Sequence, residues 1–361
     1  MFEKAWKKIL RRQRFSFLAI PAFFLWLVSF VYRFAVSVRR SASRVRVRVD
    51  VPVISVGNIA VGGTGKTPMV GFLARFLLDE GYRVAVVSSG YGRRSSAPIL
   101  EPGYRLQNVA TDDVGDEVKL LADLLPDAVF AVDKVKAAAV KRVAAGGDID
   151  VIIVDDGFQH FQLHRDIDIV TYDAGVRRGL LKPFPYGVLR EPPGALRRAD
   201  IIVITRAKFA KDLHRLQTRL RAINPQAQHY HARFSASDLL SADQSRSVKY
   251  LEDKSVFLFA GVGNFRSVRR QVAALCADLD CALELSDHQR YDIRLLKRIK
   301  SLADKYDSDV ILTTAKDRVK IEDFDFDREF YYLNQVVDLD PGEEKLIFYL
   351  VDKLGIRRRA D

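Results

Sequence analysis

The sequence predicts an α/β protein built on a doubly wound, mostly parallel sheet. Short apolar runs rich in β-branched residues alternate with helical patterns along most of the chain, which is typical of such a sheet. One run, residues 51–56, leads into a glycine-dense turn and then a helical pattern. A Ser- and Asp-rich stretch near 235–247 indicates a linker to a second unit. We expect a ligand at the carboxyl ends of the strands in the first unit.

The larger unit is expected over residues 49–240 and a smaller α/β unit over 250–361. After the strand at 51–56, Pro68 is expected to open a helix that closes at Gly81, because proline suits a first helical turn and glycine a helix end. The other expected elements are strands at 83–88, 128–132, 148–154, 167–172 and 201–205, helices at 116–125 and 134–145, and, in the smaller unit, strands at 255–260 and 309–314.

The N-terminal segment, residues 1–48, is expected to associate with a membrane. Residues 15–32 are apolar and aromatic, and clustered Lys and Arg flank them on both sides. This stretch is at the lower limit of length for a spanning helix, and Pro21 is expected to kink it. We therefore expect a helix lying in the cytoplasmic leaflet with its basic residues on anionic lipid. A single short span is the alternative.

The distribution of charge argues against a nucleic-acid partner. The chain has a formal net charge of +12, but residues 1–50 hold twelve Lys and Arg against two acidic residues, a net +10. The remaining residues are therefore close to neutral and carry no general basic surface. Cys276 and Cys281 are five positions apart with no second pair, which fits neither a zinc site nor a disulfide framework. We expect a globular monomer.

The glycine-dense turn predicts a phosphate-binding loop. Glycines let backbone N–H groups converge on phosphate oxygens, and the following helix N-terminus adds partial positive charge. Lys66 is expected to reach the β- and γ-phosphates of ATP and Thr67 to hold Mg²⁺. Ala60 replaces the first glycine of the usual pattern, so the loop is a G-G-x-G-K-T variant; a glycine-rich turn with a surface lysine is the alternative. The expected ATP-binding residues are Gly62, Gly63, Thr64, Gly65, Lys66 and Thr67.

The strand at 148–154 runs into Asp155 and Asp156, which predicts carboxylates near Mg²⁺ or its water shell. A solvated acidic loop is the alternative. His160 follows, and taken alone it is more often a structural hydrogen-bonding group than a catalyst. Asp116 could be only a helix cap, and the Arg190–Glu191 pair could be only a surface ion pair. Further polar clusters at 286–288 and 313–317 are weak signals by themselves.

Taken in order, these motifs resemble those of the tetraacyldisaccharide 4′-kinase family of lipid A biosynthesis. They are G-N-x-x-x-G-G-x-G-K-T, the GYG loop, G-D-E, D-D-G-F-Q-H, L-R-E-P, D-H and T-T-x-K-D, over residues 53–321. The resemblance implies an ATP- and Mg²⁺-dependent kinase. It would phosphorylate the 4′-hydroxyl of a tetraacylated glucosamine disaccharide 1-phosphate at the cytoplasmic face of the inner membrane.

The resemblance also implies roles for individual residues. Asp116 is similar to the catalytic aspartate of the family and His288 to the histidine that works with it. A carboxylate oriented by histidine can accept the proton of an attacking hydroxyl. The implied metal neighbours, with Thr67, are Asp155, Asp156, Gln159 and Glu191, and the implied substrate or active-site contacts are Tyr91, His160 and Arg190.

Two positions and one segment depart from the family pattern. Ser89 stands where the family has arginine, Ala315 where it has Glu or Pro, and residues 176–187 differ from the usual segment. These departures concern substrate contacts more than the reaction. The rival interpretation is a membrane-associated nucleotide-switch ATPase or GTPase. The dimeric ATPases of that class have a lysine just before the double glycine, where this chain has Val61. Residues 314–317 do not match the motif by which GTPases recognise guanine. A scaffold with a degenerate nucleotide site is disfavoured by Lys66, Thr67 and the aspartate pair.

Overall fold

One mixed sheet of thirteen strands forms the framework of the computed structural model, which describes Trp6, Leu10 and residues 19–43, 46–241, 244–321 and 324–356. The strand order is β11-β10-β12-β13-β8-β7-β6-β1-β5-β2-β4-β3, with β9 paired to β8. The strands are β1 (Val53–Asn58), β2 (Val84–Ser88), β3 (Ile99–Pro102), β4 (Val129–Val132), β5 (Val151–Asp155), β6 (Ile167–Asp173), β7 (Ile201–Thr205), β8 (Gln228–Leu240), β9 (Ser245–Ser247), β10 (Ser255–Ala260), β11 (Asp278–Glu284), β12 (Val310–Thr314) and β13 (Glu329–Asp340).

The predicted α/β class is confirmed. Strand β1 lies between β5 and β6, parallel to both, and all six of its residues are buried. Helices follow most strands, as the alternating sequence pattern predicts. The helices are α2 (Ala19–Ala42), α3 (Lys66–Asp79), α4 (Gly103–Leu106), α5 (Thr111–Val114), α6 (Asp116–Leu124), α7 (Lys136–Ala145), α8 (Leu213–Ile223), α9 (Phe265–Val272), α10 (Ile293–Lys305), α11 (Ala315–Arg318) and α12 (Glu343–Leu354).

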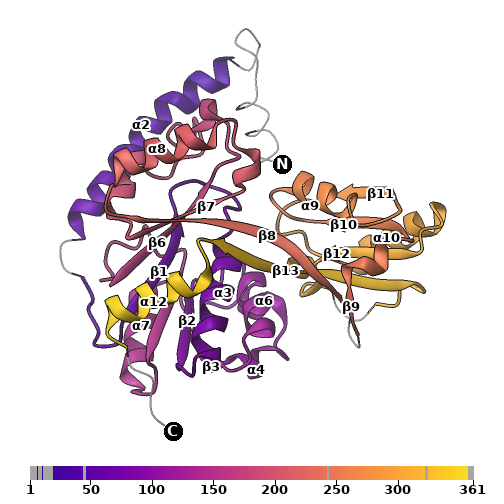
Figure 1. Cartoon of the computed structure of the whole chain (residues 1–361), viewed down its shortest axis with the longest axis horizontal. Coiled ribbons are helices and arrows are strands. Elements are labelled where there is room, and N and C mark those ends of the chain that lie inside the picture. Colours follow the sequence, from indigo (N-terminus) through magenta and orange to yellow (C-terminus); the bar gives the residue numbers. More distant parts are fainter. Residues whose placement is uncertain are drawn as a thin grey trace.

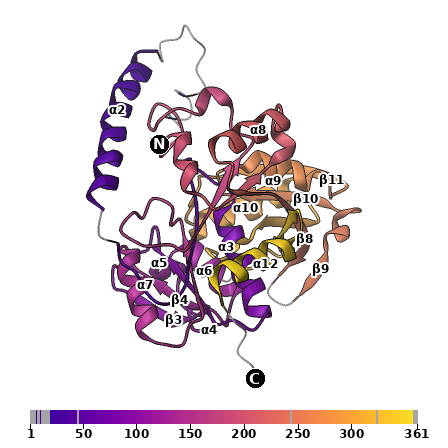
Figure 2. The same cartoon turned by 60° about the vertical axis from the view of Figure 1, so that its left-hand side comes forward.

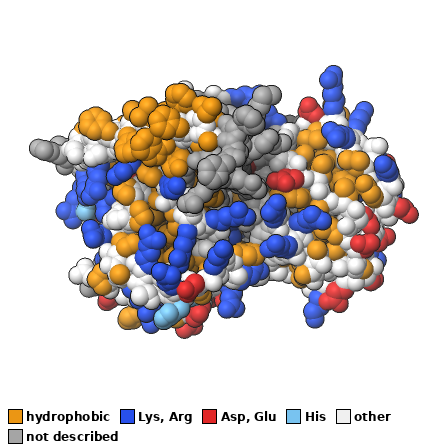
Figure 3. Space-filling view, turned by 90° about the horizontal axis from the view of Figure 1, so that it is seen from above, with side chains coloured by type: hydrophobic (Ala, Val, Ile, Leu, Met, Phe, Trp, Pro, Cys, Tyr) orange, Lys and Arg blue, Asp and Glu red, His pale blue; other side chains and the backbone are white. Residues whose placement is uncertain are grey.

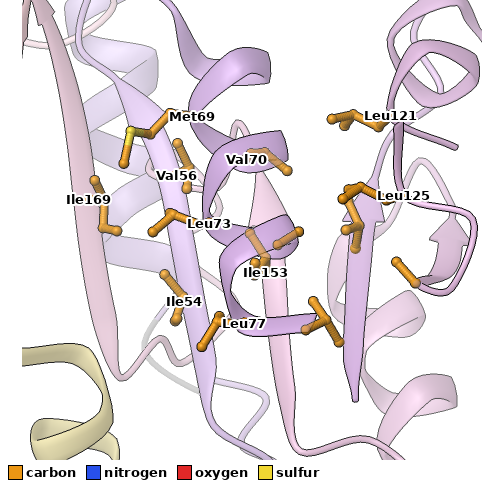
Figure 4. Packing of buried hydrophobic residues seen from close by; sticks show 14 of the residues in the cluster. Ile54, Val56, Met69, Val70, Leu73, Leu77, Leu121, Leu125, Ile153 and Ile169 are labelled. Atoms are coloured by element: carbon orange, nitrogen blue, oxygen red, sulfur yellow. The ribbon is translucent and has the colours of Figure 1, made fainter. Parts of the chain in front are cut away.

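Helix α3 is packed against the centre of the sheet. It starts at Lys66, two residues before the predicted Pro68. Its inner face carries Met69, Leu73 and Leu77, which contact the β-branched side chains of the sheet, while α6 packs beside it (Figure 4). Because the first turn of α3 continues directly from the glycine loop, this packing fixes the loop against the carboxyl end of β1.

The two halves of the molecule share two long strands, β8 and β13 (Figure 1). Strand β8 pairs with β7 over its first residues and with β13, antiparallel, over its later ones. The predicted linker at 235–247 is therefore wrong. Ser235, Ser237 and Asp238 occupy exposed or partly exposed positions of β8, as do Ser245 and Ser247 of β9, where polar side chains are tolerated in a strand.

The predicted range of the smaller unit, 250–361, also needs correction at its end. Helix α12 returns to the larger half, where Leu346, Ile347 and Leu350 belong to the same buried cluster as α3 and β1. The smaller half instead has its own clusters around β10 and β12, covered by α9 and α10. The C-terminal helix thus closes the core that supports the phosphate loop.

Helix α2 stands along one side of the molecule, away from the sheet (Figure 2). It extends ten residues beyond the predicted end at Tyr32, whereas residues 15–18 of the predicted segment lie outside the described residues. Its length and composition would allow it to cross a membrane, and only 11% of its most apolar window is buried. Tyr32 of α2 contacts the ring of Phe184, and Trp6, which lies before the helix, contacts the same ring.

Candidate active site

The phosphate loop is fixed by hydrogen bonds from the neighbouring strands. The Thr64 hydroxyl lies 2.8 Å from both Asn58 Nδ2 and Thr171 Oγ1. The Thr205 hydroxyl donates to the Thr64 carbonyl at 3.0 Å, and Arg206 donates to the Gly63 carbonyl at 2.9 Å. The side chains that bind the loop come from the ends of β1, β6 and β7. The loop is therefore held in shape by the sheet itself.

Glycine is required at position 65 for two reasons. Its φ of +91° lies in the left-handed region, and a Cβ there would come within 2.4 Å of the Phe234 ring. The predicted lysine and threonine follow as the first two residues of α3, at the positive end of the helix. The local geometry thus fits a bound phosphate group.

The segment carrying Arg190 and Glu191 is joined directly to the phosphate loop. Val61 N donates to the Val188 carbonyl at 2.7 Å, and Arg190 N donates to the Ile59 carbonyl at 2.8 Å. A loop that looks remote in sequence is therefore paired with the residues that lead into the glycines.

Asp156 faces the phosphate-loop lysine. Its Oδ1 lies 3.7 Å from Lys66 Nζ, and Arg190 Nη1 donates to both of its carboxylate oxygens at 2.9 and 2.8 Å. Although burial would raise the pKa of Asp156, the two cations outweigh it and lower that pKa well below its usual value. Asp156 is therefore ionised, and its single negative charge is shared between Lys66 and Arg190.

Asp155 has a different environment although it is the adjacent residue. Burial raises its pKa to about 7, with a further contribution from the charge of Glu117. Its Oδ1 is buried and has no hydrogen-bond partner among the described residues. An unpartnered buried carboxylate oxygen is costly unless a ligand completes it, so Asp155 fits a cation ligand. No cluster of three or more His, Cys, Asp or Glu suited to a metal occurs in the described part of the chain.

Two other predicted metal neighbours are already bound to protein groups. Both Glu191 oxygens accept hydrogen bonds from Arg198 at 2.9 Å. Gln159 Nε2 donates to Glu191 Oε1 at 3.0 Å and to the Asn58 carbonyl at 2.8 Å. These contacts favour a role in orienting the end of β1 and the turn after β5, rather than direct coordination.

Asp116 and His288 meet where the two halves of the molecule come together. Asp116 is the first residue of α6 and is 6% exposed, while His288 belongs to the loop after β11. His288 Nδ1 lies 2.7 Å from Asp116 Oδ2. Burial would raise the pKa of Asp116, but the hydrogen bond with His288 and the charge of Lys316 reverse this and lower it. The same hydrogen bond raises the pKa of His288.

Lys316 completes this cluster, and the prediction from sequence gave it no role. Its Nζ lies 3.1 Å from Asp287 Oδ1, 3.5 Å from His288 Nε2 and 3.9 Å from Asp116 Oδ2. Tyr91 also belongs here, because its ring centre is 5.3 Å from that of His288. The T-T-x-K-D motif contained the signal for Lys316, but only the fold brings it to Asp116.

Glu117, next to Asp116, acts on both the acidic turn after β5 and the Asp116 cluster. Burial and, after it, the charge of Glu117 raise the pKa of Asp155. Burial would lower the pKa of Lys316, but the charges of Asp287, Asp116 and Glu117 together raise it.

The smaller half also approaches the loop, since a Cβ on Gly263 would lie 3.9 Å from Gly63 N. Asp116 and His288, one from each half, are therefore in direct contact, and the smaller half reaches the phosphate loop.

His160 lies close to these groups but has a different character. Burial lowers its pKa to about 3, and nearby Lys136 lowers it further, so the imidazole is neutral at physiological pH. A neutral ring at the turn after β5 can donate or accept a hydrogen bond, but it adds no positive charge for phosphate. Lys136 itself was missed by the sequence analysis, because it reads as one more lysine at the start of a helix.

A cavity of about 900 Å³ opens beside the phosphate loop. It is lined by Asp173, Arg177, Lys182 and Arg266, together with apolar side chains of the segment after β6. Asp173 is bound by Arg206, the residue that donates to Gly63. The cavity is thus linked to the loop through Arg206, although none of its described lining residues belongs to residues 62–67.

The chain matches the family model for tetraacyldisaccharide-1-P 4′-kinase (LpxK) over residues 21–354. The chain belongs to the tetraacyldisaccharide 4′-kinase family. The member from Desulfotalea psychrophila is 34% identical over 309 residues, covering 84% of this chain and 88% of the relative. The member from Syntrophobacter fumaroxidans is 36% identical over 333 residues, covering 89% of this chain and 84% of the relative.

A solved structure of a 4′-kinase supports the same assignment. The crystal structure of LpxK from Aquifex aeolicus in complex with ATP superposes with a TM-score of 0.71 at 26% identity. It covers 92% of this chain and 99% of that one. The resemblance inferred from the motifs is confirmed, and the nucleotide-switch alternative is not supported.

Proposed function

We propose that this tetraacyldisaccharide 4′-kinase of lipid A biosynthesis transfers the γ-phosphoryl group of ATP where its two halves meet. The observation that carries the proposal is a pair of charged clusters: Lys66 with Asp156 at the phosphate loop, and Asp116 with His288 and Lys316 where the halves meet. The pair combines a phosphate-binding cation with a candidate proton acceptor, the two groups that phosphoryl transfer to an alcohol needs.

Lys66 and Arg190 would bind the transferred phosphoryl group. Both contact Asp156, so a phosphate would meet cations that are already oriented. Such preorganised charges stabilise the negative charge that develops on phosphoryl oxygens in the transition state. Thr67 and Asp155 would hold Mg²⁺, which would supply positive charge to offset the negative charge of the phosphates. The cavity beside the loop would take the nucleoside.

Asp116 would accept the proton of the acceptor alcohol. The 4′-hydroxyl oxygen of the disaccharide bonds to the γ-phosphorus, the bond to the leaving oxygen breaks, and ADP departs. Asp116 is suited to take the hydroxyl proton because its lowered pKa keeps it ionised at neutral pH. His288 holds the carboxylate in place at 2.7 Å, and its raised pKa favours the protonated imidazole.

Purified protein incubated with γ-labelled ATP and a tetraacylated disaccharide 1-phosphate in detergent tests this function. We expect label in the lipid, and fragmentation of the product by mass spectrometry should place the new phosphate on the 4′-oxygen. ATP hydrolysis without lipid phosphorylation would contradict the proposal.

Helix α2 would attach the enzyme to the inner-membrane surface from which the lipid comes. Its exposed apolar side chains include Phe23, Phe24, Leu27, Phe30 and Phe34. In Figure 3 hydrophobic side chains gather at one end of the face, with Lys and Arg beside them. Apolar side chains in the acyl layer and cations near anionic headgroups are the usual means of interfacial binding. We expect a monomer on the cytoplasmic side.

Flotation with anionic vesicles tests the membrane proposal. The double variant Phe24→Glu, Phe34→Glu places charges on side chains that are 59% and 71% exposed, so the fold should be unaffected. We expect it to lose most vesicle binding. Phe348→Glu, on α12 and 75% exposed, is the matched control and should float like the parent protein. Equal flotation of all three proteins would contradict a membrane role for α2.

A further inference from the structure

Lys136 is a buried lysine at the acidic turn of the active site. It is the first residue of α7 and only 2% of it is exposed. Lysine is almost never fully buried without partners that compensate its charge. No carboxylate of the described chain lies within ion-pair distance of its ammonium group, so ordinary salt-bridge pairing does not explain its burial.

The ammonium group of Lys136 binds backbone oxygens instead. It donates to the carbonyl of Asp155, and to the carbonyl of Asp156 at 3.1 Å. These are the two residues whose carboxylates differ so sharply in environment. Lys136 therefore contacts the backbone behind both side chains rather than the side chains themselves.

The turn that Lys136 contacts has an unusual conformation. Asp156 has a φ of +49°, in the left-handed region that non-glycine residues rarely adopt. Gly157 follows in a tight space, because a Cβ there would come within 2.6 Å of Ser55 Oγ. This conformation turns the two successive carbonyls toward Lys136. Such residues persist only when their surroundings hold them.

We propose that Lys136 is a positioning residue for phosphoryl transfer, whose ammonium group holds the left-handed turn at Asp156 and so directs its carboxylate toward Lys66 and Arg190. The inference rests on the proposed function for its effect on turnover, but not for its effect on the backbone. The same contact fixes the peptide unit from which the Asp155 carboxylate extends.

Hydrogen exchange of the turn tests the positioning directly. Gly157 N donates to the Val56 carbonyl and His160 N to the Gly157 carbonyl, so both amides are protected while the turn is held. In Lys136→Met we expect these amides to exchange about tenfold faster, as in local opening. Lys141→Met, an exposed lysine on the same helix, is the control and should exchange like the parent protein.

Kinetics of the same variants test the effect on the reaction. Lys136→Met should lower kcat about tenfold or more, since small displacements of catalytic groups are costly. KM for ATP and for lipid should stay within about twofold, a split that general destabilisation does not produce. Parental exchange and parental kcat in Lys136→Met would overturn the proposal. If that variant does not fold, Lys136→Gln takes its place, and parental values in both measurements would overturn the need for the ammonium group.

Failure of this proposal and failure of the proposed function give different results. If the parent protein phosphorylated no lipid, the function would be wrong, and the exchange of the turn would still report on Lys136. If the parent protein is active and Lys136→Met matches it, only the role of Lys136 is wrong.

Discussion

The two parts of the active site are held in different ways. The phosphate loop and the acidic turn after β5 belong to one half, where Asn58, Thr171 and Thr205 bind the loop from adjacent strands. Asp116 and His288 come from different halves and meet through one side-chain hydrogen bond. A site built within one sheet is preorganised, whereas a contact between halves depends on how they sit together. We therefore expect movement of one half relative to the other to leave the phosphate loop unchanged but to alter the contact between Asp116 and His288.

Lys66→Met should have the largest effect and tests the preorganised part. Removal of the ammonium group leaves the transferred phosphoryl charge without a direct partner, so we expect kcat to fall about 10³-fold. The melting temperature should hardly change, because the one ion pair of Lys66 among the described residues is a 3.7 Å contact with Asp156. Initial-rate kinetics and calorimetry check both statements. Turnover within tenfold of the parent would show that another cation does this work.

Asp116→Asn should have the next largest effect and tests the contact between halves. The amide keeps the shape of the side chain but cannot accept the proton, so we expect a loss of roughly 10² to 10³ in kcat. ATP affinity, measured by titration calorimetry, should stay within about twofold. Weakened ATP binding with normal turnover would move Asp116 to the nucleotide site.

The activity should fall at acid pH because of Asp155. Its pKa is raised to about 7, so below that pH the carboxylate is protonated and no longer suited to a cation. At limiting Mg²⁺ we expect kcat/KM to fall about tenfold per pH unit below 7. Raising the Mg²⁺ concentration should move this limb to lower pH, because a bound cation favours the ionised form. If the pH at which kcat/KM falls does not change with the Mg²⁺ concentration, the titrating group is not Asp155.

His288→Gln should have the smallest effect on rate, roughly tenfold in kcat, since it removes an orienting group and not the acceptor. The substitution also removes the charged contact with Asp116 that joins the two halves. The raised pKa of His288 means that its stabilisation is fully present below its unfolded value of 6.5 and is lost as pH rises through the folded value. The lowered pKa of Asp116 makes its stabilisation present above its unfolded value of 3.8.

The melting-temperature difference between the parent protein and His288→Gln should therefore be greatest near pH 5–6 and shrink toward alkaline pH. Differential scanning calorimetry over this range checks it. A difference independent of pH would show that the contact between halves is not held by charge.

The parts of the site that the sequence predicted well are local. Strand, glycine loop, Lys66 and helix follow one another within about twenty residues, and the aspartate pair directly follows a buried strand. The local sequence is therefore enough to predict how these residues are arranged. Asp116 and His288 could be paired only through family resemblance, because 172 positions separate them. Nothing in either tripeptide indicates the other.

The errors have the opposite cause. The stretch at 235–247 looked like a linker because its polar composition suits a loop, but β8 is stabilised there by β13, almost a hundred residues later. Lys136 looked like a solvated lysine at the start of a helix, and its partners are carbonyls on a different strand. The composition of a segment does not show which distant part of the chain will pair with it or bind its side chains.

The sequence by itself determined the α/β class, the phosphate loop, the acidic turn and the apolar N-terminal helix, since each depends on neighbours within a few residues. The tertiary structure alone decided that β8 and β13 join the halves, that α12 returns to the first core, that Lys136 is buried at the acidic turn, and that Lys316 lies beside Asp116. Those features depend on pairing and burial between remote segments, where backbone hydrogen bonds and excluded water outweigh local preference.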